Sequence, residues 1–274
     1  MADERKVAFI TGLARGQGRA HAVKLASLGW DIVGLDICAD IASMDYPNAS
    51  EADLAETIKL VQEAGGGIVA EKGDVRSYDD LRRVHAHGME RFGRVDALLC
   101  NAGITRFAPD GDRDQTWNDI IEVNLTGPWR TIEVVLPAIR AGGRGGSIVI
   151  TSSTAGLKGL ASEKAGPQAY TAAKRGLVGL MQVLANTYAS ERIRVNTIHP
   201  TGVISGMTQN PAMARLQEEA RRGGENTISH MQNALPYDIL NAEDIANAVA
   251  FLVSDQAYYI TGIQFPLDAG LSVL

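Results

Sequence analysis

The chain has 274 residues, of which 45% are hydrophobic, and its formal net charge is -6. This length suits one large domain or two small ones with a substantial buried core. An acidic chain without a basic stripe lacks the positive surface that nucleic acid binding needs. The two cysteines, Cys38 and Cys100, cannot form a disulfide framework, and neither they nor the five histidines show metal-ligand spacing. No metal site is expected.

The first residues carry no targeting signal. Residues 1–6 are charged and lead directly into an apolar strand, and no apolar run is long enough to span a membrane. We therefore expect a cytoplasmic protein without a membrane partner.

Apolar runs of strand length alternate with segments of helical periodicity. The expected strands are Val7–Ile10, Asp31–Leu35, Ile68–Ala70, Val95–Leu99, Ser147–Ile150 and Arg194–Ile198, and a seventh follows a helix near Glu243–Ser254. Further helices are expected near Gly16–Leu28, Glu51–Ala64, Tyr78–Arg91, Gln115–Arg140 and Gln168–Ala189. This order predicts an α/β fold, a doubly wound, Rossmann-type, mainly parallel seven-stranded sheet with helices on both faces. No linker interrupts it, so one domain over residues 1–274 is expected.

A glycine-rich turn follows the first strand and opens the first helix. Glycine lets such a turn approach a pyrophosphate closely, and amide groups at the helix N-terminus meet its charge. Glycine also serves simple turns, but the order of strand, turn and helix favours a nucleotide site. The expected cofactor contacts are Gly12, Arg15, Gly16, Gln17 and Gly18.

Asp36 ends the second strand and is followed by Ile37, a further expected cofactor contact. A carboxylate at this place can accept hydrogen bonds from the ribose of NAD and would repel the 2′-phosphate of NADP. Arg15 favours NADP instead, because it could pair with that phosphate. We weight Asp36 more, since a carboxylate facing a phosphate costs more than an arginine left in water. NAD is the expected cofactor.

Residues 38–50 form a longer connection than most strand-to-helix loops. They should lie beside the adenosine half of the cofactor, or they are a simple surface insertion, and the sequence favours neither reading. Ser50 and Asp53 are expected to cap the helix that follows.

Polar residues follow the third and fourth strands, at the edge where open parallel sheets bind ligands. Asp74, followed by Val75, can accept a hydrogen bond from an adenine amino group. Asn101, Ala102 and Gly103 bring a small-residue backbone to the ribose. Each of these could also be a plain turn residue.

Tyr170 and Lys174 are four residues apart in an expected helix, so the phenol and the ammonium share one face. A nearby positive charge favours the phenolate, although this spacing is common in ordinary amphipathic helices. Ser153 follows the fifth strand at the ligand edge. Asn124 lies within a long helix and is either a satisfied core amide or a residue that holds a water.

Together these motifs resemble the short-chain dehydrogenase/reductase family over residues 6–270. In that family the residues that match Asn124, Ser153, Tyr170 and Lys174 form a catalytic tetrad, and the enzymes interconvert alcohols and carbonyls with NAD or NADP. The resemblance implies that Tyr170 is the general acid and base and that Lys174 lowers its pKa. Both residues are also expected to contact the cofactor, with the Lys174 ammonium at the ribose. It also implies that Ser153 donates to the substrate oxygen and that Asn124 keeps a water in line with Lys174.

Three features depart from the family pattern. Ser153 and Tyr170 are separated by 17 positions, which is wider than usual, so residues 157–167 are expected to bulge at the mouth of the site. Cys100 replaces an asparagine and is expected to be a buried small hydrophobe rather than a reactive thiol. Thr201 replaces a glycine.

The segment after the sixth strand also matches the family. The resemblance implies cofactor contacts from Pro200, Val203 and Ser205, and a substrate lid over about residues 206–240. The apolar lid residues are Met207, Met213, Leu216, Met231, Leu235 and Tyr237. They would give the lid an adaptable inner surface, or pack a short helix pair, or do both. A hydrophobic secondary alcohol or ketone of cyclic terpenoid type is the expected substrate.

Residues 36–42, 154–159 and 199–203 are most similar to the mycofactocin-associated branch typified by carveol dehydrogenase. That branch is described as holding NAD tightly and passing electrons to another carrier. The resemblance therefore implies that residues 38–50 fold over the adenosine, that a redox carrier is a partner, and that the chain assembles as a homotetramer.

Three other readings remain. An NADPH-dependent ketone reductase is the alternative enzyme, and the others are a non-catalytic NAD(H)-sensing protein and a scaffold on the same fold. Sensors typically lack the tyrosine or the lysine, and this chain has both.

Overall fold

The computed structural model describes residues 5–108, 111–159, 161–223 and 232–274. Its sheet contains β1 (Val7–Thr11), β2 (Asp31–Asp36), β3 (Ile68–Lys72), β4 (Ala97–Cys100), β5 (Gly146–Thr151), β6 (Ile193–Pro200) and β7 (Gln264–Leu267). The strand order is β3-β2-β1-β4-β5-β6-β7, and every neighbouring pair is parallel. The predicted doubly wound fold is confirmed. The strand order reverses between β1 and β4, which places the ligand crevice of such a sheet at their carboxyl ends.

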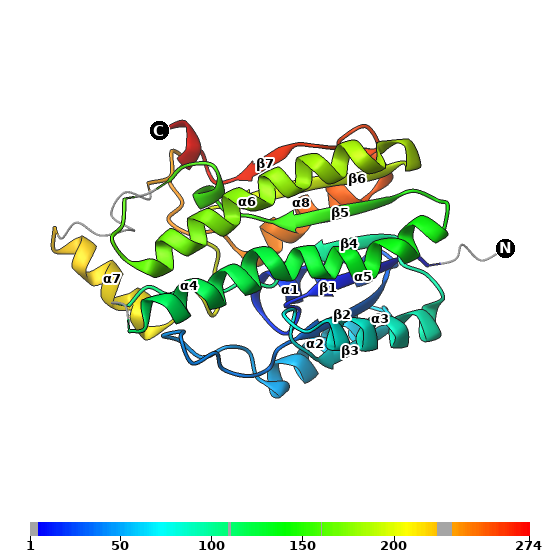
Figure 1. The fold of residues 1–274 in the computed structure, drawn as a ribbon, viewed down its shortest axis with the longest axis horizontal. Coiled ribbons are helices and arrows are strands. Elements are labelled where there is room, and N and C mark those ends of the chain that lie inside the picture. Colours follow the sequence, from blue (N-terminus) through cyan, green and yellow to red (C-terminus); the bar gives the residue numbers. More distant parts are fainter. Residues whose placement is uncertain (1–4, 109–110, 160, 224–231) are drawn as a thin grey trace.

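Helices cover both faces of the sheet. One face packs against α1 (Gly16–Ser27), α2 (Glu51–Glu63) and α8 (Ala242–Val253), and the other against α3 (Tyr78–Phe92), α5 (Gly127–Ala141) and α6 (Ala165–Tyr188). In Figure 1, α5 and α6 cross the near side of the sheet, and α4 (Arg113–Ile121) continues the line of α5. Helix α7 (Pro211–Arg221), in the segment where a lid is expected, lies beyond the carboxyl ends of the strands.

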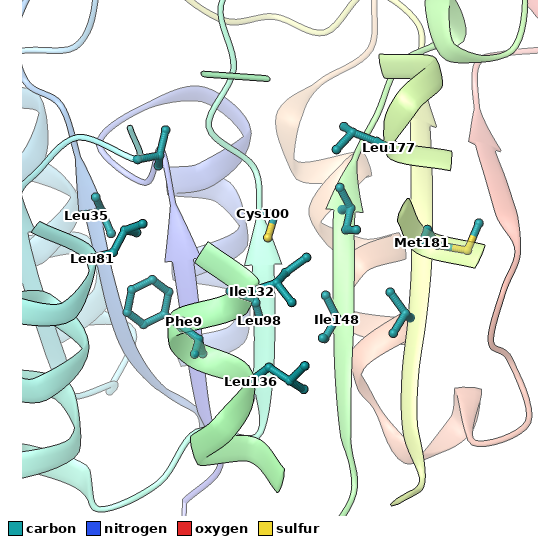
Figure 2. Packing of buried hydrophobic residues seen from close by; sticks show 14 of the residues in the cluster. Phe9, Leu35, Leu81, Leu98, Cys100, Ile132, Leu136, Ile148, Leu177 and Met181 are labelled. Carbon is teal, nitrogen blue, oxygen red and sulfur yellow. The ribbon is translucent and has the colours of Figure 1, made fainter. Parts of the chain in front are cut away.

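The core consists of two apolar clusters, one on each side of the sheet. Figure 2 shows one of them, which contains Phe9 and Leu98 of the strands, Ile132 of α5 and Leu177 of α6. Burying one such side chain contributes about 1.5–3 kcal/mol. Cys100 lies in this cluster with 1% of its surface exposed, and burial raises the pKa of its thiol. The prediction of a buried, unreactive cysteine agrees with this position.

The helix predicted near Gln115–Arg140 is helical throughout but does not keep one geometry. α4 passes into a π-helical turn at Glu122–Thr126 before α5 begins. Gly127 follows the turn, and a Cβ there would come within 2.8 Å of Val75. Turns of this kind are frequent at functional sites, and this one contains Asn124.

The predicted cap of α2 is present. The Ser50 hydroxyl accepts from the Asp53 amide at 3.2 Å, and the Asp53 carboxylate accepts from the Ser50 amide at 2.8 Å. This reciprocal pair fixes the point where residues 38–50 end and α2 begins.

Candidate functional site

The glycine turn brings the first residues of α1 to the carboxyl edge of the sheet. Gly12 and Gly16 have φ values of 68° and 55°, a region that favours glycine. A Cβ at Gly18 would lie 2.8 Å from the Cα of Leu13 and closer still to the carbonyl oxygen of Gly12. The turn can therefore stay this tight only without side chains at these positions.

A cleft of about 890 Å³, counted with the part that is open to solvent, lies beside this turn. The predicted cofactor residues that line it are Gly12, Arg15, Gly16, Gln17, Asp36, Ile37, Asp74, Val75, Asn101, Ala102, Gly103 and Ser205. The predicted cofactor residues outside its lining are Gly18, Tyr170, Lys174, Pro200 and Val203. Gly18 packs against the backbone of the glycine turn. The Val203 carbonyl accepts from the Thr208 hydroxyl at 2.6 Å.

Asn101 connects the end of β4 to the glycine turn. Its side-chain amide donates to the carbonyl oxygens of Gly12 at 3.1 Å and Thr11 at 3.3 Å, and its backbone amide donates to the Thr11 hydroxyl at 3.1 Å. The sequence predicted a ribose neighbour here. The structure adds that Asn101 also holds the turn in place.

Asp36 is buried at the end of β2. Its carboxylate accepts from the Ala14 amide at 3.0 Å and from the Cys38 amide at 3.4 Å. Burial raises the pKa of Asp36, while these amides and the charge of Arg15 oppose the rise. The carboxylate is thus held firmly against the glycine turn, at the wall of the cleft.

Arg15 crosses the cleft mouth. Its guanidinium donates to the Pro47 carbonyl oxygen at 2.6 Å. A Cβ at Gly206 would lie 2.6 Å from Nη2 of Arg15, so the guanidinium also packs directly on Gly206. One side chain therefore bridges the glycine turn, the 38–50 connection and the segment after β6.

Asp74 has a partner that the sequence analysis missed. Both of its carboxylate oxygens accept from the Arg76 guanidinium, at 2.7–3.1 Å, and one also accepts from the Arg76 amide at 2.8 Å. Arg76 also pairs with Asp119 at 3.1 Å, and Asp119 accepts from the Ser43 hydroxyl at 2.5 Å. The spacing Asp-x-Arg was the available signal. The charge that was expected to face adenine is largely neutralised by Arg76.

The connection 38–50 is not a simple surface insertion. Ile41, Met44 and Tyr46 are buried, and Tyr46 lines the cleft. The connection is anchored to residues 105–108 after β4. Tyr46 accepts from the Thr105 amide at 3.2 Å, Asp45 accepts from the Ala108 amide at 2.6 Å, and Arg106 donates to the Ser43 carbonyl at 2.7 Å.

The end of β5 meets α6 close to Gly103, which lines the cleft. The Lys174 ammonium, which is 2% exposed, donates to the Thr151 carbonyl at 2.7 Å and lies 5.5 Å from the centre of the Tyr170 ring. The Ser152 hydroxyl donates to the Lys174 carbonyl at 2.8 Å. The Ser153 hydroxyl lies close enough to the Tyr170 phenol to lower its pKa. The structure therefore brings Ser153, Tyr170 and Lys174 together.

The pKa values at this end differ from the sequence-based expectation. Burial raises the pKa of Tyr170, and the hydrogen bond from Ser153 opposes the rise. Burial lowers the pKa of Lys174 to about 8. Lys174 was expected to lower the pKa of Tyr170, but its ammonium bonds to a carbonyl and not to the phenol, so in the protein alone desolvation dominates.

Asn124 is fully buried in the π-helical turn. Its Oδ1 accepts from the Ile104 amide at 2.8 Å, and its Nδ2 donates to the Ile104 carbonyl at 2.7 Å. Both ends of the Asn124 amide are therefore hydrogen-bonded, as in the prediction of a satisfied core amide. A Cβ at Gly103 would lie 3.2 Å from Oδ1 of Asn124 and 3.4 Å from Nζ of Lys174. Gly103 therefore lets Asn124 and Lys174 approach each other at the cleft wall.

The lid segment is only partly apolar on its inner side. Met213 and Leu216 of α7 are buried and Met207 lines the cleft, but Leu235 and Tyr237 are 55% and 60% exposed. Met231 lies outside the described residues. At the mouth of the site, where a bulge was predicted, residues 157–159 and 161–164 join a short turn at Thr154–Gly156 to α6.

The described ranges contain neither a membrane-spanning helix nor a metal-binding cluster. Within them, no helix has the length and apolar character needed to cross a bilayer. Among the same residues, no three His, Cys, Asp or Glu side chains are grouped to hold a metal ion.

Comparisons with known proteins agree with this geometry. The family model described as short chain dehydrogenase matches residues 6–216. An uncharacterized oxidoreductase of Mycobacterium tuberculosis is 47% identical over 267 residues, 97% of this chain and 96% of its own. The (-)-trans-carveol dehydrogenase of Rhodococcus erythropolis is 42% identical and covers 98% of both chains. The crystal structure of carveol dehydrogenase from Mycobacterium avium in complex with NAD has a TM-score of 0.90 at 42% identity, with 98% of both chains covered. The chain therefore belongs to the short-chain dehydrogenase family.

Proposed function

We propose that this protein is an NAD-dependent alcohol dehydrogenase that interconverts a hydrophobic secondary alcohol and its ketone. The observation that carries the proposal is the meeting of Ser153, Tyr170 and Lys174 next to Gly103, a residue of the cleft that the glycine turn also lines. A proton acceptor beside a nucleotide site is the arrangement that alcohol oxidation needs. The homologues named for carveol dehydrogenase support the same reaction class.

The cleft fits a dinucleotide. Glycine at positions 12, 16 and 18 leaves room beside the start of α1, where helix amide groups can meet a pyrophosphate. Asp36 offers a fixed carboxylate to the adenosine ribose. NAD, when bound, supplies the hydride acceptor of the reaction.

NAD is favoured over NADP. The Asp36 carboxylate would meet a 2′-phosphate with like charge, and Arg15, the candidate partner for such a phosphate, is engaged by Pro47. The neighbour in complex with NAD supports the same choice.

In the oxidation direction, Tyr170 takes the proton of the substrate hydroxyl as general base. Ser153 donates to the substrate oxygen and orients it toward the hydride path. Lys174 holds the end of β5 through Thr151 and faces the Tyr170 ring with positive charge. Asn124 fixes the Ile104 backbone beside them, and a water held near Lys174 would carry the proton onward.

We also propose that residues 206–240 form a lid over the substrate. Met207 offers adaptable apolar surface to the cleft, and Met213 and Leu216 are buried in the same segment. Together with the carveol dehydrogenase relatives, this supports a cyclic, terpenoid-like alcohol as substrate.

A substrate screen tests the proposal. Purified protein is mixed with secondary alcohols of graded size and polarity and an artificial electron acceptor, and the appearance of the reduced nicotinamide or dye is followed. Cyclic terpenoid alcohols should react fastest. Faster turnover of small polar polyols would contradict the substrate class, and no turnover of any alcohol would contradict the enzyme.

We also propose that the 38–50 connection holds NAD tightly. Arg15, bonded to Pro47 and packed on Gly206, acts as a latch across the mouth of the cleft. A tightly held cofactor needs reoxidation in place, as a separate redox carrier of mycofactocin type would supply. Assembly as a homotetramer and a cytoplasmic location belong to the same proposal.

The latch is tested on purified protein. Denaturation should release one nicotinamide nucleotide from each wild-type chain, and Arg15→Met should speed exchange of added labelled NAD. Arg82→Met, at an exposed arginine of α3, is the matched control and should leave exchange unchanged. Wild-type protein that is purified without bound NAD and exchanges added NAD freely would contradict the proposed latch.

A further inference from the structure

His199 is a fully buried histidine near the end of β6, with no exposed surface. Its Nδ1 lies 2.9 Å from the carbonyl oxygen of Ser153, and its Nε2 lies 2.8 Å from the hydroxyl of Thr197. The reaction described above gives this ring no task. Both of its nitrogens nevertheless have partners, and one partner is the backbone of a catalytic serine.

The partners determine the tautomer. A carbonyl oxygen can only accept, so Nδ1 must carry the hydrogen that is donated to Ser153. In the neutral ring Nε2 then accepts from the Thr197 hydroxyl. Burial lowers the pKa of His199, as do the charges of Lys174 and Arg175, while the Ser153 bond and Asp268 oppose the shift. The ring is therefore neutral and has one fixed orientation.

The contact completes a set of anchors at the end of β5. Thr151 is held through its carbonyl by the Lys174 ammonium, and Ser152 is held through its hydroxyl by the Lys174 carbonyl. His199, on β6, holds the next residue, Ser153. Three consecutive residues are thus fixed by side chains or backbone that lie outside the strand.

Fixing the Ser153 carbonyl also fixes the direction of its hydroxyl. Ser153 sits at an extended position, with φ −169° and ψ 164°, immediately before the Thr154–Gly156 turn. Its hydroxyl accepts from the Ala155 amide at 3.2 Å and lies close enough to the Tyr170 phenol to lower its pKa. The Gly156 amide also donates to the Ser153 carbonyl at 2.8 Å, so without His199 the turn would still form but could rotate about the strand end.

We propose that His199 is a positioning residue, whose Nδ1–H holds the Ser153 peptide so that the serine hydroxyl faces Tyr170 and the substrate oxygen. This role rests on the proposed alcohol dehydrogenase activity. It extends that activity to a residue on β6 that does not line the cleft.

Two substitutions separate positioning from mere packing. His199→Leu fills similar space without a donor, and His199→Asn keeps an amide donor near the position of Nδ1. His199→Leu should lower kcat by roughly 10- to 100-fold, as small misplacements of catalytic groups do, with the Kd for NAD unchanged. It should also move the pH at which oxidation becomes fast upward, because Ser153 no longer favours the Tyr170 phenolate. His199→Asn should recover most of the lost kcat and the original pH profile.

Thr197→Val provides a second route if His199→Leu does not fold. It removes the partner of Nε2 and keeps the shape of the side chain, so it should lower kcat in the same direction but by less. Unchanged kcat in the folded variants, or equal losses in the Leu and Asn variants, would overturn the positioning role.

A readout without turnover distinguishes this proposal from the function on which it rests. In wild-type protein labelled with ¹⁵N at the histidine rings, the NMR spectrum should show His199 protonated at Nδ1 and unprotonated at Nε2. The opposite tautomer would overturn the contact even in an active enzyme. Wild-type protein that oxidises no alcohol would contradict the proposed function and the positioning role together, while the ring signals would still report the contact.

Discussion

The ammonium of Lys174 lies 5.5 Å from the centre of the Tyr170 ring, yet its 2.7 Å hydrogen bond goes to the carbonyl of Thr151. The lysine therefore acts on the tyrosine through space and on the strand end by direct contact. This dual position makes both residues informative to change.

Tyr170→Phe should abolish most turnover while cofactor binding persists. The phenol is the proton acceptor, and general-base action of this kind is worth about 10²–10⁴-fold in rate. Single-turnover kinetics with a reactive alcohol, together with NAD affinity by calorimetry, measure the two effects. Tyr259→Phe, at a side chain that is 93% exposed, is the matched control and should behave as wild type. Equal loss of NAD affinity and rate would show that Tyr170 serves the fold instead.

Stability should rise with pH in the window set by Lys174. Its pKa falls from 10.5 unfolded to about 8 folded, so between these values the unfolded chain binds more protons than the folded one. The free energy of unfolding therefore increases as pH rises through that window. The total gain from this group is roughly 3 kcal/mol, at about 1.4 kcal/mol for each pKa unit.

Urea unfolding of wild type and Lys174→Met at several pH values isolates this contribution from other titrating groups. The wild type should gain stability relative to the variant between pH 8 and the unfolded value of 10.5. Parallel curves for the two proteins would mean that Lys174 keeps its ordinary pKa in the fold.

Asp36→Asn should let the protein use NADPH. The amide oxygen can still accept from the Ala14 amide, which is 3.0 Å from the present carboxylate, but the negative charge that repels a 2′-phosphate is gone. The ratio of kcat/KM for the two cofactors in the ketone-reducing direction is the measurement. Asp79→Asn, at a fully solvated carboxylate of α3, controls for net charge. An unchanged ratio would contradict the role of the Asp36 charge in excluding NADPH and would make Arg15 the next residue to test.

Gly18→Ala should cost both stability and NAD binding. A Cβ there would come within 2.8 Å of the Leu13 backbone, so the glycine turn must open. Gly179→Ala in α6 is the matched control, since a Cβ at Gly179 meets nothing within 4 Å and alanine favours helix by about 0.5–1 kcal/mol. Melting temperature and NAD affinity together should separate the two variants. A Gly18→Ala protein that binds NAD normally would show that the turn adapts.

The sequence predicted most of what depends on local periodicity. Strands buried on both faces read as apolar runs, and the four-residue step from Tyr170 to Lys174 placed both on one face of α6 as soon as the helix was assigned. The glycine turn and Asp36 followed from the order of the elements. These features need no knowledge of side-chain packing.

Features that depend on contacts between residues far apart in the sequence were not predicted. The buried position of Tyr46 depends on Thr105, which is 59 residues away, and the bond from His199 to Ser153 spans 46 residues. Arg76 was near Asp74 in sequence, but its pairing depends on a side-chain rotamer. The π-helical turn around Asn124 changes the hydrogen-bond step of a helix without changing its apolar pattern.

The anchoring of residues 38–50 has a consequence for how nucleotide exchange responds to heat. The connection has no free hinge, because Ser43, Asp45 and Tyr46 are all bonded to residues 105–108 and Met44 is buried in the core. Opening it must break these bonds together and expose apolar surface, which makes it a local unfolding event. Unfolding rates rise about 3- to 6-fold for each 10 °C. Exchange should therefore be a thermally gated step, far more sensitive to warming than a diffusive departure from an open groove.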